Sequence, residues 1–209
     1  MSMFRTLLET KEEKGRKKVS YIQSRGAQYI DANLPFHNNG FRVDFAFSME
    51  ANYSNQYIWG AEDSSSYNKY YFKYTDSTSY SLGTYRDQYV YFPSTVGTRY
   101  EAVTSTIRYE TQYVNIDGVQ KYSTQNNKNF ARTEFSPYIF ALNSGGSPTG
   151  YSTVKLYYIR FYDESDNLLR DFEPSLDPDG VPCLYDKVND RYYYNKGTGS
   201  FLYGSVIPN

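Results

Sequence analysis

Short runs of alternating apolar and polar residues, with turn residues between them, are the feature that most constrains the fold of this chain. The clearest run is Phe41–Ser48, in which Phe41, Val43, Phe45 and Phe47 share one face. Successive side chains of a strand point to opposite faces, so this run predicts a strand with one buried and one exposed face. Runs of this kind recur about every 8–12 residues, a spacing that predicts an all-β fold of two antiparallel sheets packed as a sandwich.

Two further segments predict particular parts of that sandwich. Gln112–Ile116 is followed by Asp117 and Gly118 and then by a second run that returns to Tyr122, which is the pattern of a tight β-hairpin. Tyr138–Leu142 is a continuous apolar run of strand length. We therefore expect it to be a strand that is buried on both faces.

Aromatic residues make up much of the apolar content, with 26 Tyr, 13 Phe and one Trp among 209 residues. They favour strands, and tyrosine suits both half-buried sheet positions and contact surfaces because its ring is apolar and its tip is polar. The formal charge is −1, from 22 Lys and Arg against 23 Asp and Glu. Such a balance gives no net field to attract nucleic acid, so we expect no nucleic-acid partner.

The chain shows no apolar stretch long enough to span a membrane, and its first twenty residues lack the apolar region of a secretory signal. We therefore expect no membrane insertion and no export by the general secretory route. A protein that acts outside a cell could still be released by lysis, as virion components are.

Residues 1–20 differ in pattern from the rest and are expected to form an anchor and linker ahead of one sandwich domain at 21–209. Four apolar residues lie there at helical spacing: Met3, Phe4, Leu7 and Leu8. Two interpretations stay open. The segment is a frayed terminus, since short isolated helices are marginal in water, or it docks into a neighbouring subunit and makes the protein a homo-oligomer.

Five segments of the predicted domain resemble a known family, the three C-terminal ones in order and spacing as well. Tyr21–Asp31 looks like its opening strands, and Tyr138–Asn143 with the following glycine-rich loop is similar to its central strand. Val154–Tyr162, Leu169–Pro174 and Gly180–Phe201 resemble its C-terminal signature. The family is that of laminin G-like, concanavalin A-like jelly-roll proteins common in gut bacteria and their phages. The resemblance implies a jelly-roll fold, whose best-known use is holding glycans.

The resemblance also implies a setting for the protein. We expect a structural or decoration protein of a phage virion, head- or tail-associated, that binds host-surface glycans or a neighbouring virion protein. It would be assembled in the host cytoplasm and act outside the cell, with other virion or surface-assembly subunits as partners. The alternatives are a bacterial cell-surface carbohydrate-binding or adhesin module and, in third place, a glycoside hydrolase.

Catalytic motifs are not evident. Jelly-roll glucanases of the wider superfamily place two catalytic carboxylates on a Glu-x-Asp-x-x-Glu strand. The nearest match, Glu164-Ser165-Asp166, falls in a predicted turn and has Leu169 in place of the second Glu. The single histidine, His37, lies in a turn-rich stretch where a surface position is expected. We therefore expect no enzyme activity and no catalytic residues.

No cofactor and no metal ion is expected either. Asp177 and Asp179 lie in one tight loop, but calcium usually takes six to eight oxygen ligands. A turn in which Asp side chains cap backbone amides is the expected structure, although calcium binding stays open. The lone Cys183 is expected to be a core residue.

Sugar binding requires a flat aromatic ring that stacks on a pyranose, together with amide and hydroxyl groups. The candidates are Trp59, Tyr71, Tyr85 and Asn143. Each has a structural alternative: Trp59 lies in an apolar run typical of a core, and the tyrosines could be ordinary residues of a sheet surface.

Overall fold

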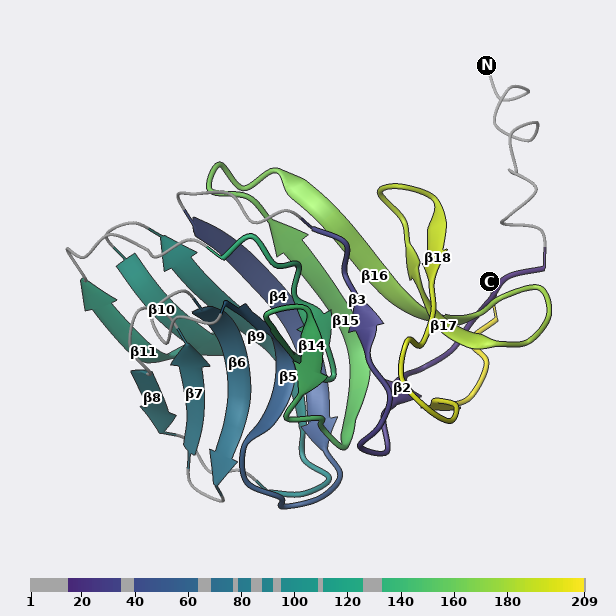
Figure 1. Cartoon of the computed structure of the whole chain (residues 1–209), viewed down its shortest axis with the longest axis horizontal. Coiled ribbons are helices and arrows are strands. Elements are labelled where there is room, and N and C mark those ends of the chain that lie inside the picture. Colours follow the sequence, from purple (N-terminus) through teal and green to yellow (C-terminus); the bar gives the residue numbers. More distant parts are fainter. Residues whose placement is uncertain are drawn as a thin grey trace.

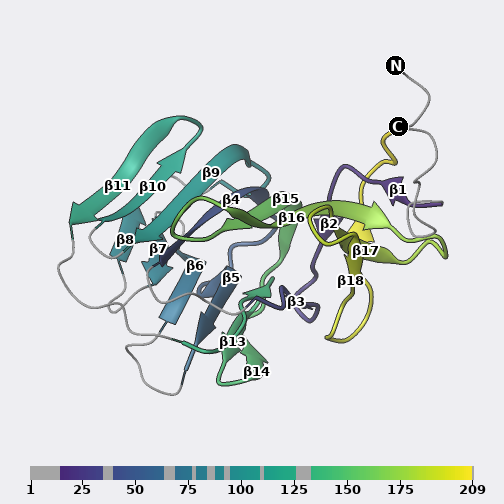
Figure 2. The ribbon, with the colours of Figure 1, turned by 90° about the horizontal axis from the view of Figure 1, so that it is seen from above.

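The computed structural model describes residues 15–34, 40–63, 69–76, 79–83, 88–91, 95–108, 111–125 and 133–208. All regular structure in these residues is β-sheet, and none of them forms a helix long and apolar enough to cross a membrane. The strands form two sheets that pack face to face (Figures 1 and 2). This confirms the predicted all-β sandwich.

The larger sheet contains the strand with the clearest alternation, and its pairs are antiparallel. Its order is β11 (Val119–Gln125), β10 (Thr111–Ile116), β9 (Arg99–Arg108), β4 (Gly40–Met49), β15 (Val154–Tyr162), β16 (Leu168–Leu176), β17 (Pro182–Asp186) and β18 (Arg191–Tyr193). Three short strands join it at one end: β1 (Lys17–Lys18), β2 (Ile22–Gln23) and β19 (Leu202–Tyr203).

The smaller sheet has one parallel pair among antiparallel ones. Its order is β14 (Ser147–Thr149), β13 (Leu142–Ser144), β5 (Gln56–Glu62), β6 (Lys69–Asp76), β7 (Ser79–Gly83) and β8 (Gln88–Tyr91). β12 (Tyr138–Ile139) pairs with β5 and also with β3 (Ile30–Asp31), which brings an N-terminal segment to the same sheet.

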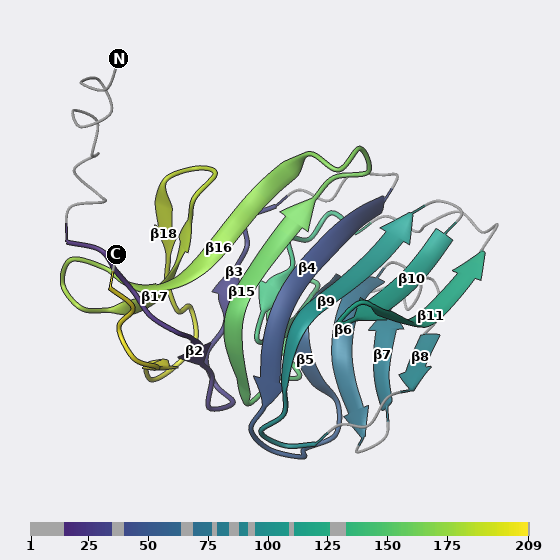
Figure 3. The same ribbon diagram turned by 180° about the vertical axis from the view of Figure 1, so that it is seen from behind.

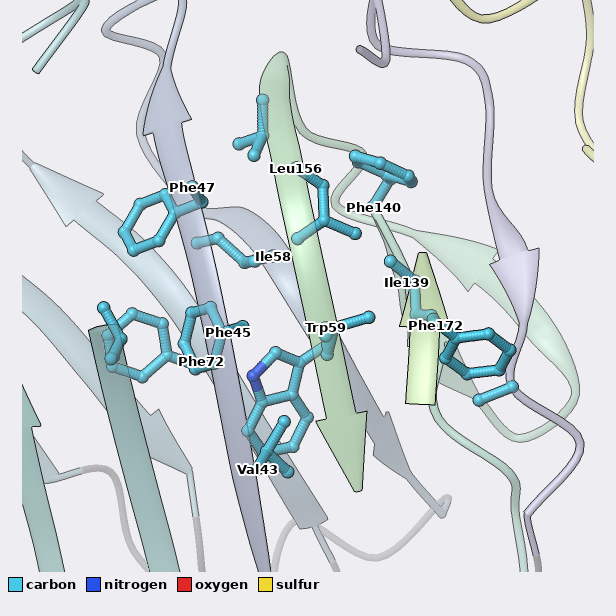
Figure 4. Close-up of a cluster of buried hydrophobic side chains, with 14 of the residues drawn as sticks. Val43, Phe45, Phe47, Ile58, Trp59, Phe72, Ile139, Phe140, Leu156 and Phe172 are labelled. Carbon is cyan, nitrogen blue, oxygen red and sulfur yellow. The ribbon is translucent and has the colours of Figure 1, made fainter. Parts of the chain in front are cut away.

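Aromatic rings fill the space between the sheets (Figure 4). The alternation of β4 directs Phe41, Phe45 and Phe47 inward, as predicted, and Trp59 of β5 lies among them. The Trp59 ring packs edge-on against Phe41 and, on the other side, against Phe161 of β15, at centroid distances of 5.6 and 6.2 Å. Burying a ring of this size contributes about 4–6 kcal/mol at about 25 cal/mol per Å².

The apolar run Tyr138–Leu142 is buried, as predicted, but it is not one strand. Phe140 has a φ of 71°, a left-handed conformation that is rare for a bulky residue. The chain changes direction there, so that β12 runs antiparallel to β5 and β13 runs parallel to it. The Phe140 ring packs against Phe201 at 5.1 Å, which holds this residue inside the core.

The predicted hairpin is confirmed: β10 and β11 pair on either side of Asp117 and Gly118, which have φ angles of 48° and 80°. The Asp117 carboxylate accepts hydrogen bonds from the backbone nitrogens of Glu101 and Ala102. The turn is therefore fastened to β9 as well as to its own hairpin.

The sandwich begins earlier in the chain than the expected boundary between residues 20 and 21. Val19 is buried, its nitrogen donates to the carbonyl oxygen of Pro174, and it forms a bridge with Val206. Arg16 and Lys18 both form ion pairs with a single carboxylate, Glu173 of β16.

The four predicted anchor residues, Met3, Phe4, Leu7 and Leu8, lie outside the described residues. The chain enters the sandwich at Gly15, beside Pro178 of the loop between β16 and β17. The C-terminal residues pair with Val19 and with β2 at the same end of the fold, so both ends of the described chain meet there (Figure 3).

Candidate functional site

A hollow of about 360 Å³ opens where the end of β3 meets β18 and the loop after it. Seven residues line it: Asp31, Asn33, Tyr192, Tyr193, Tyr194, Asn195 and Lys196. We call it the β3–β18 hollow; both strands lie at the end of the sandwich away from β8 and β11 (Figures 1 and 2). Ligand pockets usually measure about 300–1,000 Å³, whereas two other hollows on the described surface measure about 160 and 260 Å³.

Asp31 presents one carboxylate oxygen to the hollow and is held by the other. Its Oδ1 accepts hydrogen bonds from Ser136 Oγ at 2.7 Å and from the Asn33 nitrogen at 2.8 Å. Its Oδ2 faces Lys196 Nζ at 3.5 Å, and the Lys196 side chain is 58% exposed. An ion pair this exposed contributes about 1 kcal/mol or less, so a ligand can separate it at low cost.

The loop after β18 is fastened to the segment that leads into β3. Asn195 Oδ1 accepts hydrogen bonds from the backbone nitrogens of Tyr29 and Gly197, at 3.2 and 2.8 Å. Asn195 Nδ2 donates to the carbonyl oxygen of Gly199, and the Lys196 nitrogen donates to that of Tyr29. This wall of the hollow is therefore preorganised by hydrogen bonds between opposite ends of the chain.

Three consecutive tyrosines line the hollow, and two of them, Tyr192 and Tyr194, have rings close to each other. The rings of Tyr192 and Tyr194 lie 6.2 Å apart with 34° between their planes, and Tyr194 is 43% exposed. The Tyr194 hydroxyl donates to Asp177 Oδ2 at 3.0 Å. Burial and this bond to a carboxylate both raise the pKa of Tyr194, and the bond fixes the position of its hydroxyl.

The outer face of the larger sheet, which is turned to the viewer in Figure 3, carries a second group of polar side chains around β15. A bulge between Leu156 and Tyr158 turns two consecutive tyrosines, Tyr157 and Tyr158, to that face. The Arg99 guanidinium lies 3.9 Å from the centre of the Tyr157 ring, and the Tyr158 hydroxyl donates to the carbonyl oxygen of Glu101.

The charges on this face are paired with one another. Arg160 and Lys187 contact the Asp171 carboxylate at 2.9 and 2.8 Å, and Lys155 contacts Glu50 at 2.9 Å. Burial alone would raise the pKa of Asp171, but the hydrogen bonds from Lys187 and Arg160 outweigh it and lower that pKa. Because these groups already satisfy one another and the hollow beside them is only about 160 Å³, the outer face is the weaker candidate.

Three of the four predicted sugar-binding residues are buried and lie at neither surface. Trp59 is 0% exposed and Tyr71 is 1% exposed, so neither ring is available to a ligand in this conformation. Tyr85 lies outside the described residues. Asn143 is 3% exposed; its Nδ2 donates to the Ser136 carbonyl oxygen, and its Oδ1 accepts from the Gly146 nitrogen.

Sequence reasoning missed the residues of the hollow. Asp31, Tyr192, Tyr194 and Lys196 lie in the first and last segments of the family resemblance, far apart in the chain. No local spacing connects them. The clue in the sequence was that Asp31 and Asn195 lie in the two segments of the resemblance at opposite ends of the predicted domain.

The other sequence candidates occupy structural positions. Glu164 and Asp166 lie in the turn between β15 and β16, as expected. Asp177 Oδ1 accepts the backbone nitrogens of Asp179 and Val181 at 2.9 and 2.8 Å, which confirms the capped turn. His37 lies outside the described residues. Among the described residues, no group of three His, Cys, Asp or Glu side chains could hold a metal ion.

Cys183 is a fully buried core residue, as predicted. Burial raises the pKa of its thiol to about 12. A thiol in this state is a poor nucleophile at neutral pH.

No protein-family model matches the chain, and no curated protein matches its sequence. Solved structures share its fold. A candidate carbohydrate-binding protein from Bacteroides ovatus matches with a TM-score of 0.64 and 12% identity over 91% of this chain. The chain spans 62% of the length of that protein.

Two other structures cover about three quarters of this chain. The CBM40 domain of a Ruminococcus gnavus sialidase, bound to α2,3-sialyllactose, has a TM-score of 0.56 and 9% identity over 74% of this chain and 92% of its own. The laminin G-like domains 4 and 5 of the mouse laminin α1 chain have a TM-score of 0.51 and 11% identity, over 76% of this chain and 45% of theirs. At these identities the likeness shows the fold, and it confirms the predicted laminin G-like jelly roll.

Proposed function

We propose that this protein is a lectin-like module that binds carbohydrate in the β3–β18 hollow. The observation that carries the proposal is the composition of the hollow: tyrosines beside the Asp31 carboxylate, the Asn33 amide and the Lys196 ammonium group, in a space of about 360 Å³. Rings can stack on a pyranose face, and these polar groups can accept from and donate to its hydroxyls. The carbohydrate-binding proteins among the fold neighbours support the same function.

We propose further that the module binds sugar without cleaving it. Among the described residues that line the hollow, Asp31 alone carries a carboxylate. Glycosidases generally need two carboxyl groups that flank the scissile bond. One oxygen of Asp31 is already held by Ser136 and the Asn33 nitrogen, which suits a binding role.

A binding assay with matched variants tests the site. The full chain is screened on a glycan array, and the affinity for the best glycan is measured by calorimetry. Asp31→Asn is expected to weaken binding at least about 10-fold, equivalent to about 1.4 kcal/mol. Tyr158→Ala, on the outer face of the larger sheet, is expected to leave affinity unchanged. Loss of binding in Tyr158→Ala but not in Asp31→Asn would move the site to that face.

The setting that we propose is a phage virion. There the module would be a structural or decoration protein, head- or tail-associated, that binds host-surface glycans or a neighbouring virion protein. The alternative is a bacterial cell-surface adhesin module. The support comes from the sequence: the resemblance to proteins of gut bacteria and their phages, and the four apolar residues at helical spacing ahead of the sandwich.

The solution mass tests the assembly part of this proposal. Light scattering during size-exclusion chromatography compares the full chain with one that starts at Gly15. We expect a defined oligomer for the full chain and a monomer for the shortened one, because the shortened chain keeps the described fold but lacks the apolar anchor. Two monomers would contradict an assembly role for the anchor.

A further inference from the structure

The charge distribution around the β3–β18 hollow is balanced rather than positive. Among the described residues that line it, Asp31 carries the negative charge and Lys196 the positive one. A sugar that carries its own carboxylate would therefore gain no net attraction from the charged residues that line the hollow.

Arg170, which contacts the backbone of this wall, is already engaged. Arg170 donates through Nε to the Ala32 carbonyl oxygen at 3.2 Å and through Nη2 to that of Asn33 at 2.6 Å. Its Nε also lies 3.6 Å from Asp186 Oδ2, a fully buried carboxylate. Arg170 thus supports the backbone of the wall. Arginine usually recognises a carboxylate through two parallel hydrogen bonds, and Arg170 has no such pair of donors left for a ligand.

The two charged groups of the hollow form an acceptor and donor pair. Asp31 Oδ2 has a fixed direction because Oδ1 is anchored, and it can only accept hydrogen bonds. Lys196 Nζ lies 3.5 Å away, can only donate, and sits on a flexible, largely exposed side chain. Two neighbouring hydroxyls of a pyranose match this pair, since one donates to the carboxylate while the other accepts from the ammonium group.

We infer that the hollow selects neutral pyranosides through two vicinal hydroxyls that bridge Asp31 Oδ2 and Lys196 Nζ, and that it discriminates against acidic sugars. The inference rests on the proposed function, because it names the class of sugar for the same site. It separates this chain from the fold neighbour that holds α2,3-sialyllactose. A shared fold does not imply that the same sugar is bound, because the side chains in the site determine the specificity.

The test uses the full chain and pairs of sugars that differ only in charge. Calorimetry or NMR titration compares methyl glucoside with methyl glucuronide, and methyl galactoside with methyl galacturonide. We expect the neutral member of at least one pair to bind at least about 10-fold more tightly than its acidic partner. A deoxy form that lacks one of the two bridging hydroxyls is expected to lose at least about 10-fold.

Two variants link the preference to the named atoms. Asp31→Asn removes the charge while keeping the shape, and it should reduce the discrimination between neutral and acidic sugar. Lys196→Ala should lower the affinity for the neutral sugar. The Lys196 side chain is largely exposed, so this substitution should leave the fold unchanged. Tyr158→Ala serves as the unaffected control.

Each outcome distinguishes the inference from the proposed function. Tighter binding of the neutral sugars, lost in the two variants, supports both. Equal or tighter binding of the acidic sugars overturns the neutral preference and leaves carbohydrate binding standing. Binding of neither class, here and on the glycan array, overturns both.

Discussion

Replacing Gly197 with alanine is expected to separate the loop that forms one wall of the hollow from the segment that leads into β3. An added Cβ would overlap the Ala27 carbonyl oxygen and lie 3.0 Å from the carbonyl carbon. These are backbone atoms, which cannot move aside as the end of a side chain can. The loop would have to move, and the hydrogen bonds from the Thr198 nitrogen to Ala27 and from the Lys196 nitrogen to Tyr29 would be lost.

The cost of this change can be worked out from the contacts of the loop. A third hydrogen bond, from Gln28 Nε2 to the Thr198 carbonyl oxygen, also spans the junction at 2.7 Å. At about 0.5–1.5 kcal/mol each, the three bonds amount to about 1.5–4.5 kcal/mol of unfolding free energy. The affinity for sugar should fall as well, since the loop carries Asn195 and Lys196.

Urea unfolding, followed by the emission of the single tryptophan, measures the effect of Gly197→Ala. The midpoint should fall while the slope stays unchanged, because the area exposed on unfolding is the same. Thr198→Ala is the matched control: its side chain is exposed, and we expect a change within about 0.5 kcal/mol. A Gly197→Ala protein as stable as the control would refute the reasoning.

Further predictions concern Trp59, Glu173 and Cys183. Trp59→Ala should lower the unfolding free energy, measured in urea, by about 3–5 kcal/mol. When the native protein is titrated with sugar, the fluorescence emission of Trp59 should stay unchanged, because this residue is buried. Burial alone would raise the pKa of Glu173, but hydrogen bonds from Lys18 and Arg16 outweigh it and lower that pKa below 4.5. The contribution of Glu173 to stability should therefore be present above about pH 4.5 and be lost as the pH falls through the folded-state pKa. In acid titrations monitored by circular dichroism, Glu173→Gln should lose less stability over that range than the native chain. Cys183, whose pKa burial raises to about 12, should react with a thiol reagent at pH 8 only after urea unfolding, and labelling of the native protein would contradict this.

The local patterns of the sequence were enough to predict the fold class. Alternation in Phe41–Ser48 predicted the inward face of β4, and Asp117 with Gly118 predicted the hairpin of β10 and β11. Both signals act over a few residues, through the two-residue period of a strand and the conformational preferences of turn residues. For the same reason, the apolar content of Tyr138–Leu142 predicted burial but could not predict the reversal at Phe140, where contacts with distant residues decide the backbone conformation.

The tertiary structure alone decided which residues form the candidate site. Trp59 has the chemistry of a sugar platform, yet the pairing of β5 places it between the sheets. Asp31 and Lys196 are separated by 165 positions in the chain, and they meet because the loop after β18 donates backbone hydrogen bonds to the segment that leads into β3. Local patterns record strand period and turn chemistry but not which distant strands come together, and the hollow exists only through that long-range pairing.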